Sequence, residues 1–306
     1  MPLSKPLRIL SVLMNFVMVA ALSLAAEQAK VVLLGTGTPI PDPSSSGPCV
    51  AVVVTGRSYL FDAGPGVVRR AQAASEKFAM AALDATNLTR LFFTHLHSDH
   101  TLGYPDVIFT PWVVGRRQAL EVYGPEGVAA MTEHLKLAYA ADIKVRTEGA
   151  EGLSMQGLNV NVHEIAAGTV YRDENVTVKA IAVPHGSWPQ AFGYVVNAGG
   201  RTIVISGDTA PSEAIAEACK ECDVLVHEVY SAERFDLVYG PRRGQYHASF
   251  HTSTKQLAEL AAKSKPKLLV LYHQLYFGPH QEVDLEKEIR RTYRGNVVNG
   301  VDLSVY

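Results

Sequence analysis

Short apolar, β-branched runs recur along the chain and constrain its fold more than any other feature. Each run is bounded by Gly, Pro, Asn or Asp, as strands tend to be. The runs cover residues 31–35, 51–55, 59–63, 91–95, 120–124, 178–183, 192–196, 202–207, 223–228 and 268–273. Between some of them, apolar residues keep a helical spacing, as at Val128, Met131 and Leu135. About ten strands mixed with about five helices predict an α/β protein or an α+β sandwich of two sheets.

Two stretches interrupt this pattern of strands and helices. Residues 144–157 and 231–250 are polar and rich in turn-forming residues, which predicts long loops. Arg234, Arg242 and Arg243 in the second stretch are candidates to contact an anionic substrate, although a solvated basic loop fits them equally well.

The first thirty residues differ from the rest of the chain. Lys5 and Arg8 precede an apolar run over residues 9–24, and small residues follow at the place that a signal peptidase reads. We therefore expect a signal peptide over residues 1–25, a domain over 29–306, and a mature protein in the periplasm or outside the cell. An uncleaved membrane anchor is the alternative, because the run approaches the ~18 residues of a spanning helix. No other membrane contact is expected.

Charge argues against one class of partner. The 306 residues include 28 Lys and Arg against 30 Asp and Glu, for a formal net charge of −2. A protein that binds polynucleotides over its whole surface normally carries a positive excess. Nucleic acid is therefore not expected as the main partner, although a local basic patch stays open.

The three cysteines do not make a disulfide framework. Cys219 and Cys222 form a C-x-x-C pair, but no second pair exists to complete a zinc site of four thiolates. We expect both to serve packing, with a redox pair in an oxidising compartment as the alternative. Cys49 is expected to be a small core residue.

The segment Thr-His-Leu-His-Ser-Asp-His at residues 94–100 carries the strongest chemical signal. Of eleven histidines in the chain, three lie within these positions, beside Asp99 and directly after an apolar run. In extended backbone His95, His97 and Asp99 would project to one side, and His100 would follow at a turn. Imidazole nitrogens and carboxylate oxygens are ligands that zinc and similar borderline metals prefer. The sequence therefore predicts a metal site here.

This H-x-H-x-D-H pattern resembles that of the metallo-β-lactamase superfamily, and the resemblance extends over nearly all of the chain after its N-terminal segment. The segments LLGTGTPIPDP, YLFDAGPG and VYGPEG are similar to the ribonuclease Z and arylsulfatase-like branch. Pro184-His185-Gly186, Ser206-Gly207-Asp208-Thr209 and Leu271-Tyr272-His273 are similar to the later ligand motifs. The resemblance implies an α+β fold, a four-layer αββα sandwich. It also implies two divalent metal ions, with zinc expected and manganese or iron open.

By the same resemblance, seven side chains hold the two metals. They are His95, His97 and His185 for one metal, Asp99, His100 and His273 for the other, and Asp208 as the bridge. Two carboxylates would neutralise only part of the four formal positive charges, which leaves a cationic pocket suited to phosphate or sulfate esters. Hydrolysis would use a metal-bridging hydroxide positioned by Asp99 and Asp208.

Two further motifs resemble those of ribonuclease Z-like phosphodiesterases. His227-Glu228 ends an apolar run, and His251 opens a helix as part of His-Thr-Ser-Thr. We expect Asp99, which would position the hydroxide, to be catalytic together with His251 and Glu228. His251 would stabilise the transition state or protonate the leaving oxygen, and Glu228 would orient it. A buried structural acid at Glu228 and a helix-start residue at His251 are the alternatives.

Two residues are expected to support this site. Asp62, at the end of the segment Tyr-Leu-Phe-Asp, resembles a structural acid that does not itself bind metal. Trp188 lies three residues past His185, where it would form either a pocket wall or part of the core.

The sequence leaves several functions open. We expect an exported hydrolase of a phosphodiester or a related small-molecule ester. Ribonuclease Z-like cleavage of RNA shares most motifs, but no long arm rich in Gly, Pro and Lys, of the kind that grips tRNA in that family, is apparent. A short arm within residues 144–157 stays open. An arylsulfatase and a lactone or thioester hydrolase are further alternatives.

β-Lactam hydrolysis fits less well, because true metallo-β-lactamases usually have a cysteine, or no ligand, where Asp208 stands. A metal-containing binding or sensory protein is the non-enzyme alternative, and a homodimer is open.

Overall fold

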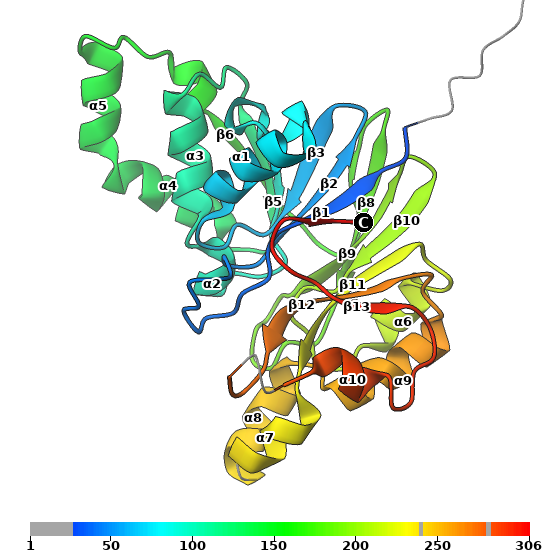
Figure 1. Ribbon diagram of the computed structural model, residues 1–306. Helices are drawn as coiled ribbons and strands as arrows, with labels where there is room; N and C mark the ends of the chain where they lie inside the picture. The colour runs from blue at the N-terminus through cyan, green and yellow to red at the C-terminus, as the bar shows by residue number, and fades with distance from the viewer. Residues whose placement is uncertain (1–26, 239–240, 280–282) are drawn as a thin grey trace, which may run out of the picture.

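Two mixed β-sheets form the centre of the molecule. The computed structural model describes residues 27–238, 241–279 and 283–306. The first sheet has the order β14-β1-β2-β3-β4-β5-β6, and the second has the order β13-β12-β11-β10-β9-β8-β7 (Figure 1). The strands of the first sheet are β1 (Lys30–Gly35), β2 (Cys49–Val54), β3 (Arg57–Phe61), β4 (Arg90–Phe92), β5 (Leu120–Gly124), β6 (Val160–Glu164) and β14 (Ser304–Val305). Those of the second are β7 (Gly168–Arg172), β8 (Val176–Ala182), β9 (Phe192–Ala198), β10 (Arg201–Ile205), β11 (Val224–Tyr230), β12 (Leu269–Leu275) and β13 (Val297–Asn299).

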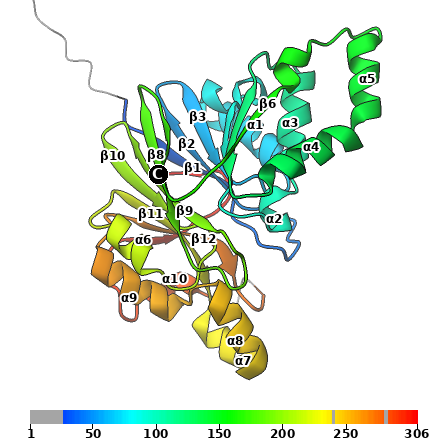
Figure 2. The same ribbon diagram turned by 180° about the vertical axis from the view of Figure 1, so that it is seen from behind.

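Helices cover the outer face of each sheet. On the first sheet lie α1 (Val67–Phe78), α3 (Tyr104–Val113) and α4 (Val128–Ala138), and on the second lie α6 (Glu213–Ala218), α9 (Thr254–Ser264) and α10 (Leu285–Ile289). The remaining helices are α2 (Ser98–Thr101), α5 (Ala140–Glu148), α7 (Ala232–Val238), α8 (Pro241–Phe250) and the 3-10 turns η1 (Ala81–Leu83), η2 (Ala85–Asn87) and η3 (Met155–Leu158). Seen from behind, α4 and α5 project beyond the sheets at one end, and α7 and α8 project at the other (Figure 2).

Side chains alternate between the two faces of each central strand, so one set packs between the sheets and the other packs against the helices. Successive side chains of a strand point to opposite faces. In β1, Val31 and Leu33 pack between the two sheets, whereas Val32 and Leu34 pack against the helices of the first sheet. Because both faces of the central strands are buried, these strands appear in the sequence as nearly continuous apolar runs. The layer order is helix, sheet, sheet, helix, which confirms the predicted α+β sandwich.

The ten expected strands are present, with ends shifted by a few residues, but both predicted loops are wrong. The stretch 144–157 contains the end of α5 and the turn η3, and the stretch 231–250 contains α7 and α8. The strands β6, β7, β13 and β14 were not expected from the sequence.

The strand directions bring one end of each sheet together. In the first sheet β3, β4, β5 and β6 are parallel neighbours. In the second sheet β10, β11, β12 and β13 are parallel, and β8 shares their direction because both β8 and β10 are antiparallel to β9. Loops that follow these strands therefore converge at the edge where the parallel strands end, which is where α/β sheets commonly carry their sites.

Cys219 and Cys222 are joined by a disulfide, so the expectation that they only pack is corrected. Both are also buried against the helices of the second sheet, and Cys49 is a buried free thiol as expected. The predicted signal peptide at residues 1–25 lies outside the described residues. In the part of the chain that is described, no helix is both long and apolar enough to cross a membrane.

Candidate metal centre

Four of the predicted ligands follow β4 directly. The strand ends at Phe92, residues 93–96 belong to no strand or helix, and His97 is the residue before α2. Asp99 and His100 lie inside this short helix, so the expected extended projection of Asp99 beside His97 is wrong. The helical turn still brings both side chains to the same place, because it reverses the chain directly after His97.

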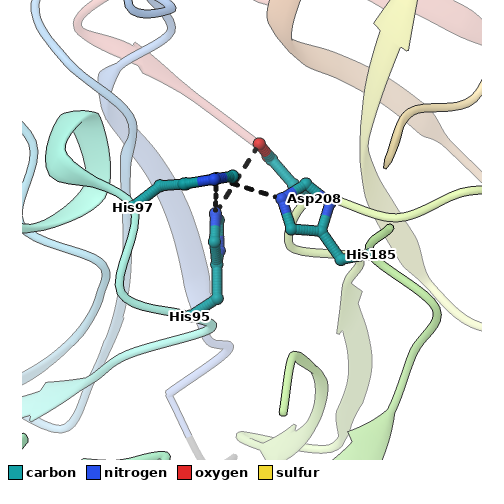
Figure 3. A group of neighbouring side chains, drawn as sticks. All are labelled: His95, His97, His185 and Asp208. Atoms are coloured by element: carbon teal, nitrogen blue, oxygen red, sulfur yellow. Dashed lines mark hydrogen bonds and ion pairs between the residues drawn. The ribbon is translucent and has the colours of Figure 1, made fainter. Parts of the chain in front are cut away.

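The first group of side chains contains His95, His97, His185 and Asp208 (Figure 3). His97 Nδ1 lies 2.9 Å from His95 Nε2 and 3.1 Å from His185 Nε2. Asp208 Oδ2 lies 3.9 Å from His95 Nε2. Three imidazole nitrogens and one carboxylate oxygen thus point toward a common point, from loops that follow strands in both sheets.

The second group contains Asp99, His100 and His273. His273 Nε2 lies 3.2 Å from Asp99 Oδ2, and His100 Nε2 lies 3.5 Å from the same oxygen. Asp208 Oδ2 is 3.3 Å from His100 Nε2 and 3.4 Å from His273 Nε2. Asp208 therefore lies between the two groups, as expected for a bridging residue.

Unusual backbone positions the two ligands of the second sheet. His273 has a φ of 44° and interrupts the register between β11 and β12. Such a bulge re-aims one side chain out of the regular alternation of a strand. Gly207, with a φ of 60°, places Asp208, and a Cβ at Gly207 would come within 2.6 Å of the Phe192 carbonyl oxygen. Left-handed backbone at a non-glycine residue carries strain, and such strain is commonly found at functional sites.

Neighbouring acceptors fix the tautomers of three histidines. His100 Nδ1 donates to Asp62 Oδ2 at 2.8 Å, and His185 Nδ1 donates to the Phe250 carbonyl at 2.8 Å. The Thr94 hydroxyl donates to Asp62, so it accepts the hydrogen bond from His95 Nδ1. Each Nδ1 proton therefore points away from the centre, and each Nε2 faces it. Metal-binding histidines are held in this way by outer hydrogen bonds.

These side chains fit a pair of divalent cations. In the described part of the chain, His100 Nε2 and Asp208 Oδ1 are buried without a hydrogen-bond partner. Buried polar atoms are normally paired, so their convergence suits a bound cation. The donor set of imidazoles and carboxylates is the one that zinc accepts, and iron and manganese accept it too.

Burial and charge shift the pKa values of the group in opposite directions. Burial lowers the pKa of His95 and lowers that of His185 to about 4, so both are neutral near pH 7. Burial opposes protonation of His100 as well, but Asp208 and Asp62 raise its pKa overall. Asp208 is buried, yet His273 and His100 hold its pKa well below its usual range. The negative charge that attracts a cation is thus retained.

His251 and Glu228 lie beside the ligands. His251 Nδ1 lies 3.4 Å from Glu228 Oε2 and 3.9 Å from Asp208 Oδ2. Glu228 is fully buried in β11, and its Oε1 accepts a hydrogen bond from the Thr252 amide. Burial raises the pKa of Glu228 and lowers that of His251 to about 4. Glu228 thus contacts both His251 and the backbone of the residue that follows it.

Aromatic rings surround the first group. Trp188 Nε1 donates to His97 Nε2 at 2.6 Å, and its ring meets that of His97 edge-on. Trp188 therefore borders the site and is not part of the core. The Phe250 ring packs edge-on against His185, and it leaves no room for a Cβ at Gly186. Sequence reasoning missed Phe250, because its contact with His185 joins segments far apart in the chain.

Two expectations concern residues near the site. Asp62 supports the ligands through Thr94 and His100, as expected. Arg234 is half-buried on α7, whereas the side chains of Arg242 and Arg243 lie outside the described residues.

Comparison with known proteins identifies the family. A family model described as a beta-lactamase superfamily domain matches residues 57–274, a span that contains all seven expected ligands. The chain therefore belongs to the metallo-β-lactamase superfamily and is a metal-dependent hydrolase of that fold. A hydrolase, rather than a non-catalytic binding protein, is the class that the fold and the relatives define.

Within this class the chain is similar to proteins named ribonuclease Z. That of Mycobacterium bovis (strain BCG / Pasteur 1173P2) is 30% identical over 280 residues, which cover 90% of this chain and 96% of the relative. That of Mycobacterium sp. (strain KMS) is 32% identical over 277 residues, which cover 90% and 94%.

Solved structures share the fold at lower identity. The metallo-β-lactamase fold protein YhfI from Bacillus subtilis has a TM-score of 0.69 at 17% identity, covering 92% of this chain and 100% of that one. Human tRNase Z, short form, has a TM-score of 0.66 at 24% identity, covering 90% and 98%.

Proposed function

We propose that this protein hydrolyses phosphodiesters and that a small-molecule diester is its substrate. The observation that carries the proposal is the convergence of the six other ligand side chains around Asp208, with His251 and Glu228 directly beside it. A site that holds two cations next to a buried imidazole is suited to esters with a negatively charged oxygen.

We propose that His95, His97 and His185 hold one divalent cation, that Asp99, His100 and His273 hold a second, and that Asp208 contacts both. Zinc is proposed, with manganese and iron accepting the same donors. When bound, such a pair lowers the pKa of water and stabilises negative charge that develops on substrate oxygen. Asp99 and Asp208 would orient the attacking water through their carboxylate oxygens.

His251 is proposed to act on the leaving oxygen. Its side chain is only 13% exposed, and its low pKa keeps the ring neutral at pH 7. A neutral imidazole still carries one N–H, which can donate a hydrogen bond to an oxygen that gains charge. Glu228 is a positioning residue in this proposal: burial raises its pKa, so the protonated carboxyl can donate to His251 Nδ1 and leave the ring's single N–H on Nε2 for the leaving oxygen.

Paired charges on the projecting helix α5 support a small substrate. On α5, Arg146 contacts Asp142 at 3.0 Å and Glu151 at 2.9 Å, and Lys144 lies 4.0 Å from Glu148. These cations are neutralised locally, whereas a surface that binds RNA uses its Lys and Arg to contact phosphates. Cleavage of RNA is the second candidate, and the ribonuclease Z names of the relatives favour it.

Turnover of bis(p-nitrophenyl) phosphate by the metal-loaded protein tests the proposal. We expect hydrolysis that a chelator abolishes, and a loss of about 10²–10³-fold in kcat for His251→Ala, the scale of removing one transition-state donor. His163→Ala is the matched control, because His163 is a half-exposed histidine paired with Glu121. No turnover with metal bound would contradict the proposal, and faster cleavage of a tRNA precursor than of any small diester would select the second candidate.

We also propose that the protein is exported to the periplasm or secreted. The charged start and apolar run of residues 1–25 support export, and the Cys219–Cys222 disulfide suits an oxidising compartment. N-terminal sequencing of protein from the periplasmic fraction tests this, with cleavage near Ala26 expected. An intact N-terminus in the membrane fraction would favour the anchor instead.

A further inference from the structure

An apolar groove adjoins the candidate metal centre. A cavity of about 660 Å³ lies between the loop that follows β1 and the short helix α2. Ser98, Asp99 and Leu102 line its α2 side, so the groove shares Asp99 with the second ligand group. Its volume falls within the roughly 300–1,000 Å³ of small-ligand pockets.

The lining of the groove is unusual for a site that handles anions. Ile40 and Leu102 expose 59% and 63% of their surface at this place. Prolines make up much of the remaining lining, at residues 39, 41, 43 and 65. Among the described residues that form the groove, Asp42 and Asp99 are the charged ones, and no Lys, Arg or aromatic ring takes part.

The groove wall is held in place before any ligand arrives. Thr36 donates to Asp302 Oδ1 through both its amide and its hydroxyl, each at 2.9 Å. The Ser46 amide donates to Asp302 Oδ2 at 2.7 Å. One carboxylate therefore ties both ends of the loop to the C-terminal segment, and the prolines between them restrict the backbone. A rigid wall loses little entropy when it binds a ligand.

We propose that this groove binds an aliphatic arm of the substrate ester while the metal centre holds the ester group itself. The inference rests on the proposed function, and it narrows the substrate to a diester with an alkyl substituent. An RNA strand would find neither cations for its phosphates nor rings for its bases in this lining. An alkyl chain instead covers the exposed surface of Ile40 and Leu102, which water otherwise contacts.

A series of n-alkyl phosphonates from methyl to hexyl tests the proposal, with affinity for the metal-loaded protein measured by calorimetry. Phosphonates are not hydrolysed, so binding is separated from turnover. We expect affinity to rise with each added methylene, up to about fourfold per fully buried group. Leu102→Asn and Ile40→Asn should flatten this dependence. Val145→Asn is the matched control, because Val145 is 68% exposed on α5, which does not line the groove.

The outcomes separate the groove from the proposed function. Affinity that is equal at every chain length overturns the groove, and so does a hexyl phosphonate that fails to bind. A clear dependence on chain length that Leu102→Asn removes, in a protein that hydrolyses no phosphodiester, would keep the groove and reject the phosphodiesterase. Hydrolysis of small diesters, with an affinity that does not depend on chain length, would keep the phosphodiesterase and reject the groove.

Discussion

Single residues outside the ligand set hold the site in its geometry. Asp62 is 2% exposed and accepts hydrogen bonds from the Thr94 amide, the Thr94 hydroxyl and His100 Nδ1. It therefore fixes both the start of the histidine segment and the tautomer of His100. Its own φ of 63° places the carboxylate off the line of β3.

Asp62→Asn should weaken metal binding without removing a ligand. The amide keeps the shape of the side chain but loses one acceptor oxygen, so His100 is no longer held with its proton outward. We expect a loss of about 10–100-fold in metal affinity, as for other outer partners of histidine ligands. Competition with a chromophoric chelator measures it, and affinity within twofold of the native protein would contradict the role of Asp62.

His227 should make the stability of the metal-free protein depend on pH. Burial lowers its pKa from 6.5 to about 4. The unfolded chain therefore binds a proton more readily than the folded chain between these values, and stability falls as pH decreases through this window. His227 alone would cost about 2 kcal/mol of unfolding free energy between pH 7 and pH 5.

Urea unfolding at pH 7 and pH 5 measures this dependence in the native protein and in His227→Gln. The variant should lose less stability than the native protein across the interval, whatever its stability at pH 7. Equal losses in both proteins would show that His227 does not titrate in this way.

At the scale of elements, the loops at one edge of the sandwich carry the chemistry. The loop from Thr36 to Ser46 is tied down by Asp302, which also accepts a contact from Arg70 at 3.4 Å. The loop after β8 brings His185 and Trp188 to the first ligand group. Both are short segments whose ends are fixed by regular structure or by a buried carboxylate.

Asp302→Ala should loosen the wall of the groove. Removing the carboxylate leaves the amides of Thr36 and Ser46 without their acceptor. Hydrogen bonds to a charged acceptor each contribute about 1.5–3 kcal/mol, so we expect the loss of these two to cost about 3–6 kcal/mol of stability. Hydrogen exchange of these two amides should accelerate, and unchanged exchange would show that the loop does not depend on Asp302.

Trp188 should report metal binding by its fluorescence. The chain has two tryptophans, and the other, Trp112, is 2% exposed and donates to the Ser154 carbonyl, away from the ligands. A cation at His97 changes the charge and the proton position of the ring that Trp188 contacts. Metal titration should therefore change emission in the native protein and leave Trp188→Phe nearly unchanged. An equal response in both proteins would place Trp188 away from the bound metal.

Sequence patterns predicted most of the fold because the central strands are buried on both faces. The helices in the stretches 144–157 and 231–250 were missed for a physical reason. None of the residues in α5 is buried, so it has no apolar stripe to reveal it. The start of α7 depends on Glu288, which accepts from the Ala232 amide and from the Ser231 hydroxyl across 56 and 57 residues of sequence. Because these hydrogen bonds come from a residue far away in the sequence, no local sequence pattern predicts the start of this helix.

The sequence predicted the residues of the candidate site better than it predicted the contacts around them. Histidine spacing identified the segment at residues 95–100, and resemblance to the family supplied His185, Asp208 and His273. No pattern indicated that Phe250 packs on His185 or that Asp302 ties the loop from Thr36 to Ser46, because these contacts join segments far apart in the chain. Contacts like these, which lie outside the ligand set, can be identified only once the fold is known.

At the scale of the whole molecule, the two sheets share one site. The first sheet supplies His95, His97, Asp99 and His100, and the second supplies His185, Asp208 and His273. Neither half holds all of the proposed ligands, so a bound metal pair would join the halves of the sandwich. Whether two copies of the chain associate stays a prediction that sedimentation can test.

Metal content and diester hydrolysis, measured together in the native protein and in Asp208→Ala, test the central claim most directly. Asp208 lies between both ligand groups, within 3.3 Å of His100 Nε2 and 3.9 Å of His95 Nε2. We predict about two metal ions per native chain, and a variant that stays folded but loses metal and at least 10²-fold in rate together. An Asp208→Ala protein that keeps full metal content and full activity would contradict the account.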